Sequence, residues 1–409
     1  MIPHLFPFKC LALACISLCF AAPASFAAAD RPDRPGRPDR STSADIRAAV
    51  DGAIHPVMAK YGVPGMAVAV TINGQTLFFN YGIASKESGA AVNENTLFEL
   101  GSISKTLTAT LACYAQGMGK LSFEDHPGRY MPQLKGSAID AASLIDLGTY
   151  AAGGLPLQFP EEVKDNAQML AYFRAWKPEG PPGTLRRYSN PSLGLFGYVT
   201  GLALHSDFGD AMERQLLPAL GMKHSHVQVP ASAMAHYAWG YDQQDKPVRV
   251  RPDVLDVETY GIKSTTADMI RFVQQNIQPD GLTAPFERAI ACTHVGYSQV
   301  GDMVQGLGWE QYRGSVSLQR LLAGNSDKMI NESNPASRLT PPQPAPGGTL
   351  FNKTGSTRGF GAYVVFKPEQ KIGIVILANK SYPISARVTA AYAILQQLEQ
   401  AAQPVSNHQ

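Results

Sequence analysis

The chain has 409 residues, of which 44% are hydrophobic, and its 35 lysines and arginines nearly balance its 33 aspartates and glutamates, giving a net charge of +2. This composition is typical of a globular protein with a large core, and it argues against a chain that lacks stable structure. No block of basic residues points to nucleic acid, so we expect no nucleic-acid partner.

The N-terminus predicts a cleavable signal peptide over residues 1–29. Lys9 precedes the apolar run 10–20, and small residues follow this run. The run is too short to span a bilayer. Cleavage after Ala27 and cleavage after Ala29 fit the sequence equally well. We therefore expect export to the periplasm, with no membrane contact once the signal is removed.

A leader rich in proline, arginine and aspartate is expected over residues 30–43, because this segment has no apolar side chain to bury. Ser43 is a candidate cap for the first helix, in which apolar residues recur at helical spacing as far as Tyr61. From there the pattern predicts one domain over residues 44–405.

Two hairpins are predicted near the two ends of that domain. Asn73-Gly74 joins the apolar runs 65–72 and 75–79, and both turn residues tolerate positive φ. The runs 361–366 and 372–378 are rich in β-branched and aromatic residues and form the second hairpin. An amphipathic helix follows, with its apolar stripe between Val388 and Leu398.

These elements predict an α/β (α+β) fold. An antiparallel sheet would be flanked by N- and C-terminal helices and would be built from residues 44–100 and 310–405. A mainly helical lobe would be inserted at about 101–309. A cleft between the two lobes is where we expect a small-molecule site.

The segment FELGSISKTL, residues 98–107, carries the first chemical signal. If a helix begins at Ser102, Lys105 lies three residues later on the same face, where its amine can hold the serine hydroxyl and help remove its proton. A serine that only caps a helix would give the same pattern. Ser104 is interpreted as a bystander.

Two later segments add compatible groups. Tyr188-Ser189-Asn190 follows an arginine pair, and a nearby cation makes the loss of a phenolic proton easier. Lys353-Thr354-Gly355 opens the C-terminal hairpin and offers a cation and a hydroxyl for an anion. Gly355 would let a substrate approach the strand, and the backbone N–H of Ser356 can donate to an oxyanion.

The three motifs, in this order, resemble the active-site set of class C (AmpC-type) serine β-lactamases, cephalosporinases of the penicillin-recognising serine hydrolase superfamily. Further segments such as GMAVAV, AAGGLPLQFP, GLGWE and LAGNSD are also similar to the family, from about residue 44 to about 398. The resemblance implies a β-lactamase/DD-peptidase-like fold. It also implies hydrolysis of cephalosporins and other β-lactam antibiotics through an acyl-enzyme on Ser102, which confers antibiotic resistance.

The resemblance assigns catalytic roles to Ser102, Lys105, Tyr188 and Lys353. Ser102 matches the nucleophile and Lys105 its hydrogen-bonded lysine. Either Tyr188 or Lys105 is the general base, and the motif does not decide between them. Lys353 matches the lysine that supports Tyr188 and meets the substrate carboxylate.

Seven further positions match substrate-binding positions of the family: Gln158, Asn190, Tyr260, Thr354, Gly355, Ser356 and Arg387. The amides of Gln158 and Asn190 would hold the acylamino side chain, and Tyr260 would wall its pocket. Thr354 would bind the carboxylate, and the N–H groups of Ser102 and Ser356 would form the oxyanion hole.

Three positions depart from the common pattern of the family. Ile384 replaces an asparagine that helps bind the substrate carboxylate, so Arg387, Thr354 and Lys353 would take more of that task. Asn352 stands where histidine is frequent, and Arg358 stands at a usually small position near the pocket edge. These changes leave the reaction type alone and bear on the range of substrates.

We expect no cofactor and no metal. His224 and His226 are a close histidine pair, but the sequence offers no nearby third ligand for zinc, so we interpret them as packing or surface residues.

Cys113 and Cys292 remain after signal cleavage. Cys113 lies in an apolar helical pattern, which favours an unpaired buried thiol over a disulfide. The partner is a small β-lactam substrate, and we expect a monomer.

Three alternatives stay open. A D-alanyl-D-alanine peptidase or penicillin-binding protein of the superfamily could carry the same motifs and deacylate slowly, and a family-like carboxylesterase could use the same serine. A non-catalytic binding protein would have lost the nucleophile or the base, whereas this chain keeps both.

Overall fold

The computed structural model describes residues 40–402, with side chains from residue 43 onward. The predicted signal peptide and most of the predicted leader lie outside these residues. Helix α1 (Arg40–Tyr61) begins before Ser43, so the predicted cap is wrong and the end of the leader is helical. The reason is that the last leader proline is Pro38, and no later residue up to Ser43 prevents a helix.

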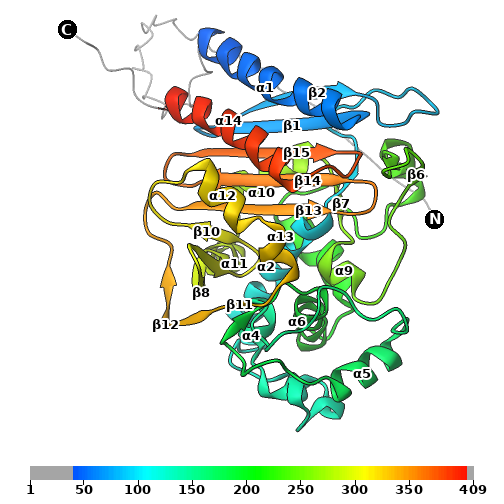
Figure 1. Cartoon of the computed structure of the whole chain (residues 1–409), viewed down its shortest axis with the longest axis vertical. Helices are drawn as coiled ribbons and strands as arrows, with labels where there is room; N and C mark the ends of the chain where they lie inside the picture. The colour runs from blue at the N-terminus through cyan, green and yellow to red at the C-terminus, as the bar shows by residue number, and fades with distance from the viewer. Residues whose placement is uncertain (1–39, 403–409) are drawn as a thin grey trace, which may run out of the picture. The chain divides into compact units, whose positions relative to one another are not determined.

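A nine-stranded antiparallel sheet forms the upper part of the domain, as Figure 1 shows. Its strand order is β12-β8-β9-β10-β13-β14-β15-β1-β2. The strands are β1 (Gly65–Ile72), β2 (Gln75–Gly82), β8 (Val295–Val300), β9 (Met303–Gly306), β10 (Glu310–Tyr312), β12 (Ser337–Pro344), β13 (Leu350–Ser356), β14 (Gly361–Lys367) and β15 (Ile372–Ala378).

The two ends of the domain build one sheet, as predicted, and they meet where β15 pairs with β1, close to the β2 edge. β1 pairs with β15 in the register Met66↔Ala378, and β1 and β2 form the N-terminal hairpin. Asn73 and Gly74 both have positive φ at its turn, as the sequence indicated. The sheet also includes β8 and β9, which lie before residue 310, so the sheet lobe takes in more of the chain than we expected.

Helices cover both faces of the sheet, and this explains why β1 is buried along its whole length. On one face Val68 packs in a core with residues of α1 and α14 (Ile384–Ala402). On the other face Ala69 packs in a core that includes Phe272 of α10 (Thr266–Ile277). Each fully buried large apolar side chain contributes about 1.5–3 kcal/mol, so these two cores hold the layers together.

The remaining helices build the lower lobe and add to the cores on the two faces of the sheet. They are α2 (Ser104–Gly117), α3 (Pro127–Tyr130), α4 (Leu144–Gly148), α5 (Asn166–Ala175), α6 (Asn190–Ala203), α7 (Phe208–Ala211), α8 (Leu217–Ala219), α9 (Asp256–Thr259), α11 (Ala284–Thr293), α12 (Leu318–Gly324) and α13 (Asp327–Asn331). A third core joins residues of α2, α4 and α6.

Short pieces complete the chain. The 3-10 helices span Gly101–Ile103, Pro132–Leu134, Ala138–Ala141 and Ala231–His236, and a π-helical turn spans Met212–Leu216. The two-residue strands are β3 (Phe98–Glu99), β4 (Leu185–Arg186), β5 (Gly240–Tyr241), β6 (Pro247–Val248), β7 (Lys263–Ser264) and β11 (Asn334–Pro335). Within the described residues, no helix is both long and apolar enough to cross a membrane.

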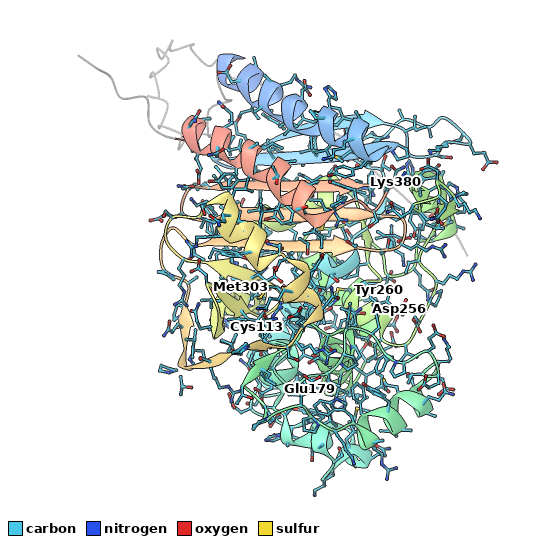
Figure 2. The ribbon with its side chains drawn as sticks, in the orientation of Figure 1. Cys113, Glu179, Asp256, Tyr260, Met303 and Lys380 are labelled. Atoms are coloured by element: carbon cyan, nitrogen blue, oxygen red, sulfur yellow. A yellow bond between two sulfur atoms is a disulfide. The ribbon has the colours of Figure 1, made fainter. Side chains whose placement is uncertain are left out.

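A disulfide joins Cys113 of α2 to Cys292 of α11, so the expectation of an unpaired thiol is wrong. The two Cα atoms are 5.9 Å apart, although the residues are separated by 179 positions in sequence. α11 packs against α2, and this packing creates a proximity that sequence spacing does not encode. Figure 2 labels Cys113 among the side chains of the domain.

Candidate active site

Ser102 lies in the 3-10 turn Gly101–Ile103, directly before α2. The residues that cap this turn and α2 are Leu100 and Ile103, and neither makes a side-chain capping bond. Ser102 is therefore not a helix cap. Its hydroxyl instead accepts a hydrogen bond of 2.9 Å from Nζ of Lys105, so of the two sequence interpretations the geometry favours the chemical one.

Two glycines bring the turn at Ser102 against the edge of β13. Gly101 has φ +54°, and a Cβ there would lie 2.4 Å from the backbone nitrogen of Ser356. A Cβ on Gly355 would lie 2.0 Å from the carbonyl oxygen of Leu100. Gly355 thus admits another stretch of backbone, a role that the sequence did not suggest. The contact places the backbones of Ser102 and Ser356, the expected oxyanion donors, side by side.

Lys105 is buried beneath the serine. Its Nζ donates to Ser102 Oγ and, over 2.8 Å, to the carbonyl oxygen of Thr259. Burial lowers the pKa of Lys105 from 10.5 to about 8; the charge of Lys353 acts in the same direction, and Tyr188 opposes both. A buried amine with this pKa can exchange a proton near neutral pH.

Tyr188 lies between two ammonium groups. Nζ of Lys105 is 5.4 Å from the centre of its ring, and Nζ of Lys353 is 4.9 Å from it. Burial raises the pKa of Tyr188, but the two lysines and the nearby Ser102 hydroxyl lower it and hold the pKa at about 8, below the usual 10. The arginine pair suggested from the sequence is not the main cause of the lowered pKa: Arg187 pairs with Glu179, and Arg186, whose Cζ lies 5.5 Å from the centre of the Tyr188 ring, is paired with Glu310.

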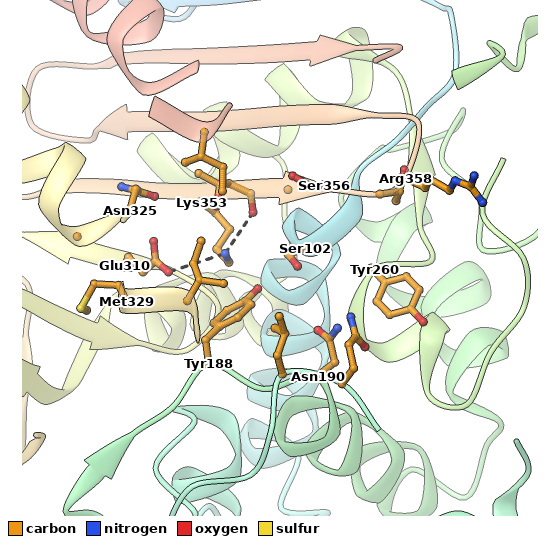
Figure 3. Close-up of a pocket in the computed structure, with 18 of the residues that line it drawn as sticks. Ser102, Tyr188, Asn190, Tyr260, Glu310, Asn325, Met329, Lys353, Ser356 and Arg358 are labelled. Carbon is orange, nitrogen blue, oxygen red and sulfur yellow. Dashed lines mark hydrogen bonds and ion pairs between the residues drawn. The ribbon is translucent and has the colours of Figure 1, made fainter. Parts of the chain in front are cut away.

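The second member of that arginine pair belongs to a buried ion cluster that sequence reasoning missed. Oε1 of Glu310 lies 3.4 Å from Nη2 of Arg186 and 3.8 Å from Nζ of Lys353. Arg186 also donates to the carbonyl oxygen of Met329 and to the side chain of Gln305. Figure 3 shows Glu310 beside Lys353. Glu310 comes from β10, far from both cations in sequence, and no local pattern marks such a pair.

The other wall of the pocket holds the predicted amides. Gln158, Asn190 and Tyr260 line a cavity of about 330 Å³ together with Ser102, and Figure 3 shows Asn190 and Tyr260 there. Oδ1 of Asn190 is buried and has no hydrogen-bond partner within residues 40–402. An unpaired buried acceptor beside a cavity suits a ligand N–H.

The predicted residues of β13 also line the cavity: Lys353, Thr354, Gly355 and Ser356. Ile384 and Arg358, two of the departures from the family pattern, line it as well. Asn352 is instead buried, where it accepts a hydrogen bond of 3.1 Å from Asn325. Because Ile384 and Arg358 line the cavity and Asn352 does not, only the first two can contact a substrate.

Arg387 is the predicted site residue that the structure does not bring into the pocket. It is buried behind β13, where Nη1 donates to the carbonyl oxygen of Gly355 (2.6 Å) and to Oγ of Ser356 (2.8 Å). Nη2 donates to the carbonyl oxygen of Tyr382 over 2.5 Å. Burial lowers the pKa of Arg387 to about 10. Arg387 therefore braces the strand that forms the pocket edge.

Ser104, interpreted as a bystander, is buried and accepts a hydrogen bond of 3.2 Å from the backbone N–H of Ile262. His224 is exposed and His226 is half-buried. Across residues 40–402, no three or more histidine, cysteine, aspartate or glutamate side chains gather where they could hold a metal ion.

Comparisons with known proteins agree with this geometry. The family profile described as Beta-lactamase matches residues 50–399. A beta-lactamase of Pseudomonas fluorescens is 51% identical over 356 residues, covering 87% of this chain and 99% of the relative. The beta-lactamase of Escherichia coli (strain K12) is 41% identical over 351 residues, with 86% of this chain and 93% of the relative covered.

Solved structures give the same result. A class C beta-lactamase in complex with cefoxitin is 47% identical, with a TM-score of 0.84 and coverage of 87% of this chain and 99% of that chain. A structure described as D-alanine carboxypeptidase AmpC from Burkholderia cenocepacia is 45% identical, with a TM-score of 0.83 and the same coverage.

Proposed function

The chain belongs to the β-lactamase family and is a serine β-lactamase of class C, and from this premise we propose that Ser102 is the nucleophile that opens the lactam ring. The observation that carries the proposal is the 2.9 Å hydrogen bond from Lys105 to Ser102, beside a tyrosine held between two ammonium groups.

In the acylation step, Oγ of Ser102 attacks the lactam carbonyl carbon and its proton passes to the Lys105–Tyr188 pair. Both groups have a pKa of about 8, so the pair titrates as a unit near neutral pH and either member can be the acceptor. The backbone N–H groups of Ser102 and Ser356 hold the oxyanion. The C–N bond then breaks, and the hydroxyl of Tyr188 protonates the departing nitrogen.

In the deacylation step, water attacks the ester on Ser102 and gives its proton to the phenolate of Tyr188. The serine leaves and takes back a proton, which regenerates the resting site. Both lysines favour the phenolate because they lower the pKa of Tyr188, so the same group serves as base for water.

Substrate binding divides between the two walls of the pocket. Lys353 and Thr354 would bind the lactam carboxylate, with Arg387 acting only through β13. Asn190 and Gln158 would hold the acylamino group. We propose a preference for cephalosporins, a monomeric state and a periplasmic location.

Turnover of nitrocefin by the purified protein, with and without EDTA, tests this proposal. We expect steady hydrolysis that EDTA does not change. A stoichiometric burst without turnover would contradict it and would favour a penicillin-binding protein.

A second activity, removal of a terminal D-alanine from peptides, is a candidate because a structural neighbour at 45% identity is described as a D-alanine carboxypeptidase. Release of D-alanine from a peptide ending in D-alanyl-D-alanine, abolished in Ser102→Ala, would support this activity at the same serine. No release at millimolar peptide would exclude it.

A further inference from the structure

Arg358 stands on the rim of the active-site pocket, in the turn between β13 and β14. Its side chain is 75% exposed. In Figure 3, Arg358 and Tyr260 lie on one side of Ser102, whereas Lys353 and Tyr188 lie on the other. Arg358 is therefore on the side of the pocket that faces the acylamino group of the substrate, not the side that faces the lactam carboxylate.

A buried carboxylate holds Arg358 in this position. Oδ2 of Asp242, whose side chain is only 4% exposed, accepts a hydrogen bond of 3.1 Å from Nη2 of Arg358. Oδ1 of Asp242 is already engaged by the backbone N–H groups of Gln244 and Lys246. The Lys246 N–H above all, followed by Gln244 and Arg358, lowers the pKa of Asp242, so the anchor stays ionised at neutral pH.

The turn that carries Arg358 is itself fixed to the strands beside Asp242. The backbone N–H of Tyr241 donates to the carbonyl oxygen of Gly359 over 3.2 Å. A Cβ on Gly359 would lie 2.9 Å from Cα of Gly240, so the two backbones touch. The backbone position of Arg358 is therefore set by the fold, and one hydrogen bond ties its guanidinium to Asp242.

In Figure 3 the guanidinium of Arg358 extends outward from the rim, away from Ser102, where the far end of a long acylamino side chain could meet it. Of the five N–H donors of a guanidinium, one meets Asp242. The other two cations that line the pocket, Arg186 and Lys353, are buried and both lie against Glu310. Among the cations of residues 40–402 that line the pocket, Arg358 is the exposed one, with a single hydrogen bond to its buried partner Asp242. A planar guanidinium of this kind suits a carboxylate.

We propose that Arg358 makes this enzyme favour β-lactams whose acylamino side chain ends in an anionic group, such as a carboxylate. The proposal rests on the proposed function, because it takes the acylamino group to lie along Asn190 and Tyr260. It adds a second anion-binding point to the site, separate from the one at Lys353 that the lactam carboxylate would occupy.

The test uses two cephalosporins that share one ring system. One carries a glutaryl side chain with a free terminal carboxylate, and the other carries the methyl ester of that side chain. For Arg358→Gln we expect kcat/KM to fall about fivefold or more for the free acid and to stay within about twofold for the ester, as for a partly exposed charge pair. Raising the salt concentration should also reduce the preference of the wild-type enzyme for the free acid over the ester.

Arg214→Gln is the matched control. Arg214 forms an ion pair with Asp210, at side-chain exposures of 77% and 51%, and does not line the pocket. This variant also removes one positive charge, and it should leave the ratio of kcat/KM between the two substrates unchanged.

Three results would overturn the proposal. Equal losses on both substrates would make Arg358 a structural brace of its turn, and equal rates in wild type and Arg358→Gln would remove any role in selection. If wild-type enzyme hydrolysed neither cephalosporin, the proposed function itself would fail, and the preference with it.

Discussion

The two sides of the pocket treat charge in opposite ways. On the Tyr188 side, Lys105, Lys353, Arg186 and Glu310 are all buried, and their charges act mainly on one another. On the Tyr260 side, Gln158 and Arg358 are exposed and Tyr260 is half-buried, although Asn190 is buried. Because burial strengthens electrostatic interactions, the first side can shift pKa values far enough to move protons. The Tyr260 side can only favour the binding of one substrate over another.

This difference predicts two kinds of variant. Changes on the buried side should slow the reaction for every lactam, since they alter the step that all substrates share. Changes on the exposed side should alter the ratio between substrates, since they touch only the variable part of the molecule.

The largest effect is expected for Tyr188→Phe. Loss of the hydroxyl removes a group that both accepts and returns protons, so kcat should fall about 10³-fold for penicillins and cephalosporins alike. Steady-state kinetics on one substrate of each kind would measure it. Tyr260→Phe is the matched control and should stay within a few-fold of wild type. A fall in kcat for only one of the two substrate classes would contradict the proposed difference between the two sides of the pocket.

The next effect is expected for Lys353→Met and concerns pH. The positive charge of Lys353 lowers the pKa of both Tyr188 and Lys105, so removing it raises both values. The acid limb of the kcat/KM profile, expected near pH 8 in the wild type, should move up by about one unit, with roughly tenfold less activity at neutral pH. Lys367→Met, which removes a cation paired with Glu399, is the control. An unmoved acid limb would contradict this electrostatic account.

A smaller and selective effect is expected for Asn190→Ala. Its unpaired buried Oδ1 suits the N–H of an acylamino side chain, so kcat/KM should fall about tenfold for benzylpenicillin. The same variant should lose little on 6-aminopenicillanic acid, which has no acyl group. Equal losses of kcat/KM on both compounds would mean that Asn190 acts in the reaction common to all substrates and does not bind the acylamino group. Thermal unfolding would check that the variant is folded.

The smallest effect on rate is expected for the double variant Cys113→Ala/Cys292→Ala. The disulfide closes a loop of 179 residues and lies at the far end of the helix that carries Lys105, so it should affect stability only. We expect a loss of about 4 kcal/mol in the free energy of unfolding and kcat within twofold of wild type. Calorimetry should show that dithiothreitol lowers the melting temperature of the wild type and not that of the variant.

Sequence reasoning recovered the parts of this molecule that local patterns encode. The hairpins follow from Asn73-Gly74 and from alternating apolar runs, and three short motifs marked Ser102, Tyr188 and Lys353. Contacts between segments far apart in the sequence were harder to predict. The Arg186–Glu310 pair spans two strands far apart in the chain, and its members carry no local signal of burial.

The errors have the same cause. Arg387 was placed against the substrate because its position matches a substrate-binding position of the family, but α14 packs so that this side chain points beneath β13. The disulfide was not expected because only the packing of α11 on α2 brings its cysteines together. The roles of Gly101 and Gly355 likewise needed the structure, since each glycine makes room for the backbone of the other segment.

The central claim, that Ser102 is the acylated residue, can be tested by mass spectrometry. The wild-type protein, mixed with a slowly hydrolysed lactam such as cefoxitin and quenched, should gain one lactam mass on the peptide that contains Ser102. Ser102→Ala should gain none, while Ser104→Ala, which changes the buried neighbouring serine, should still be labelled. A covalent adduct that persists on Ser102→Ala would contradict the account.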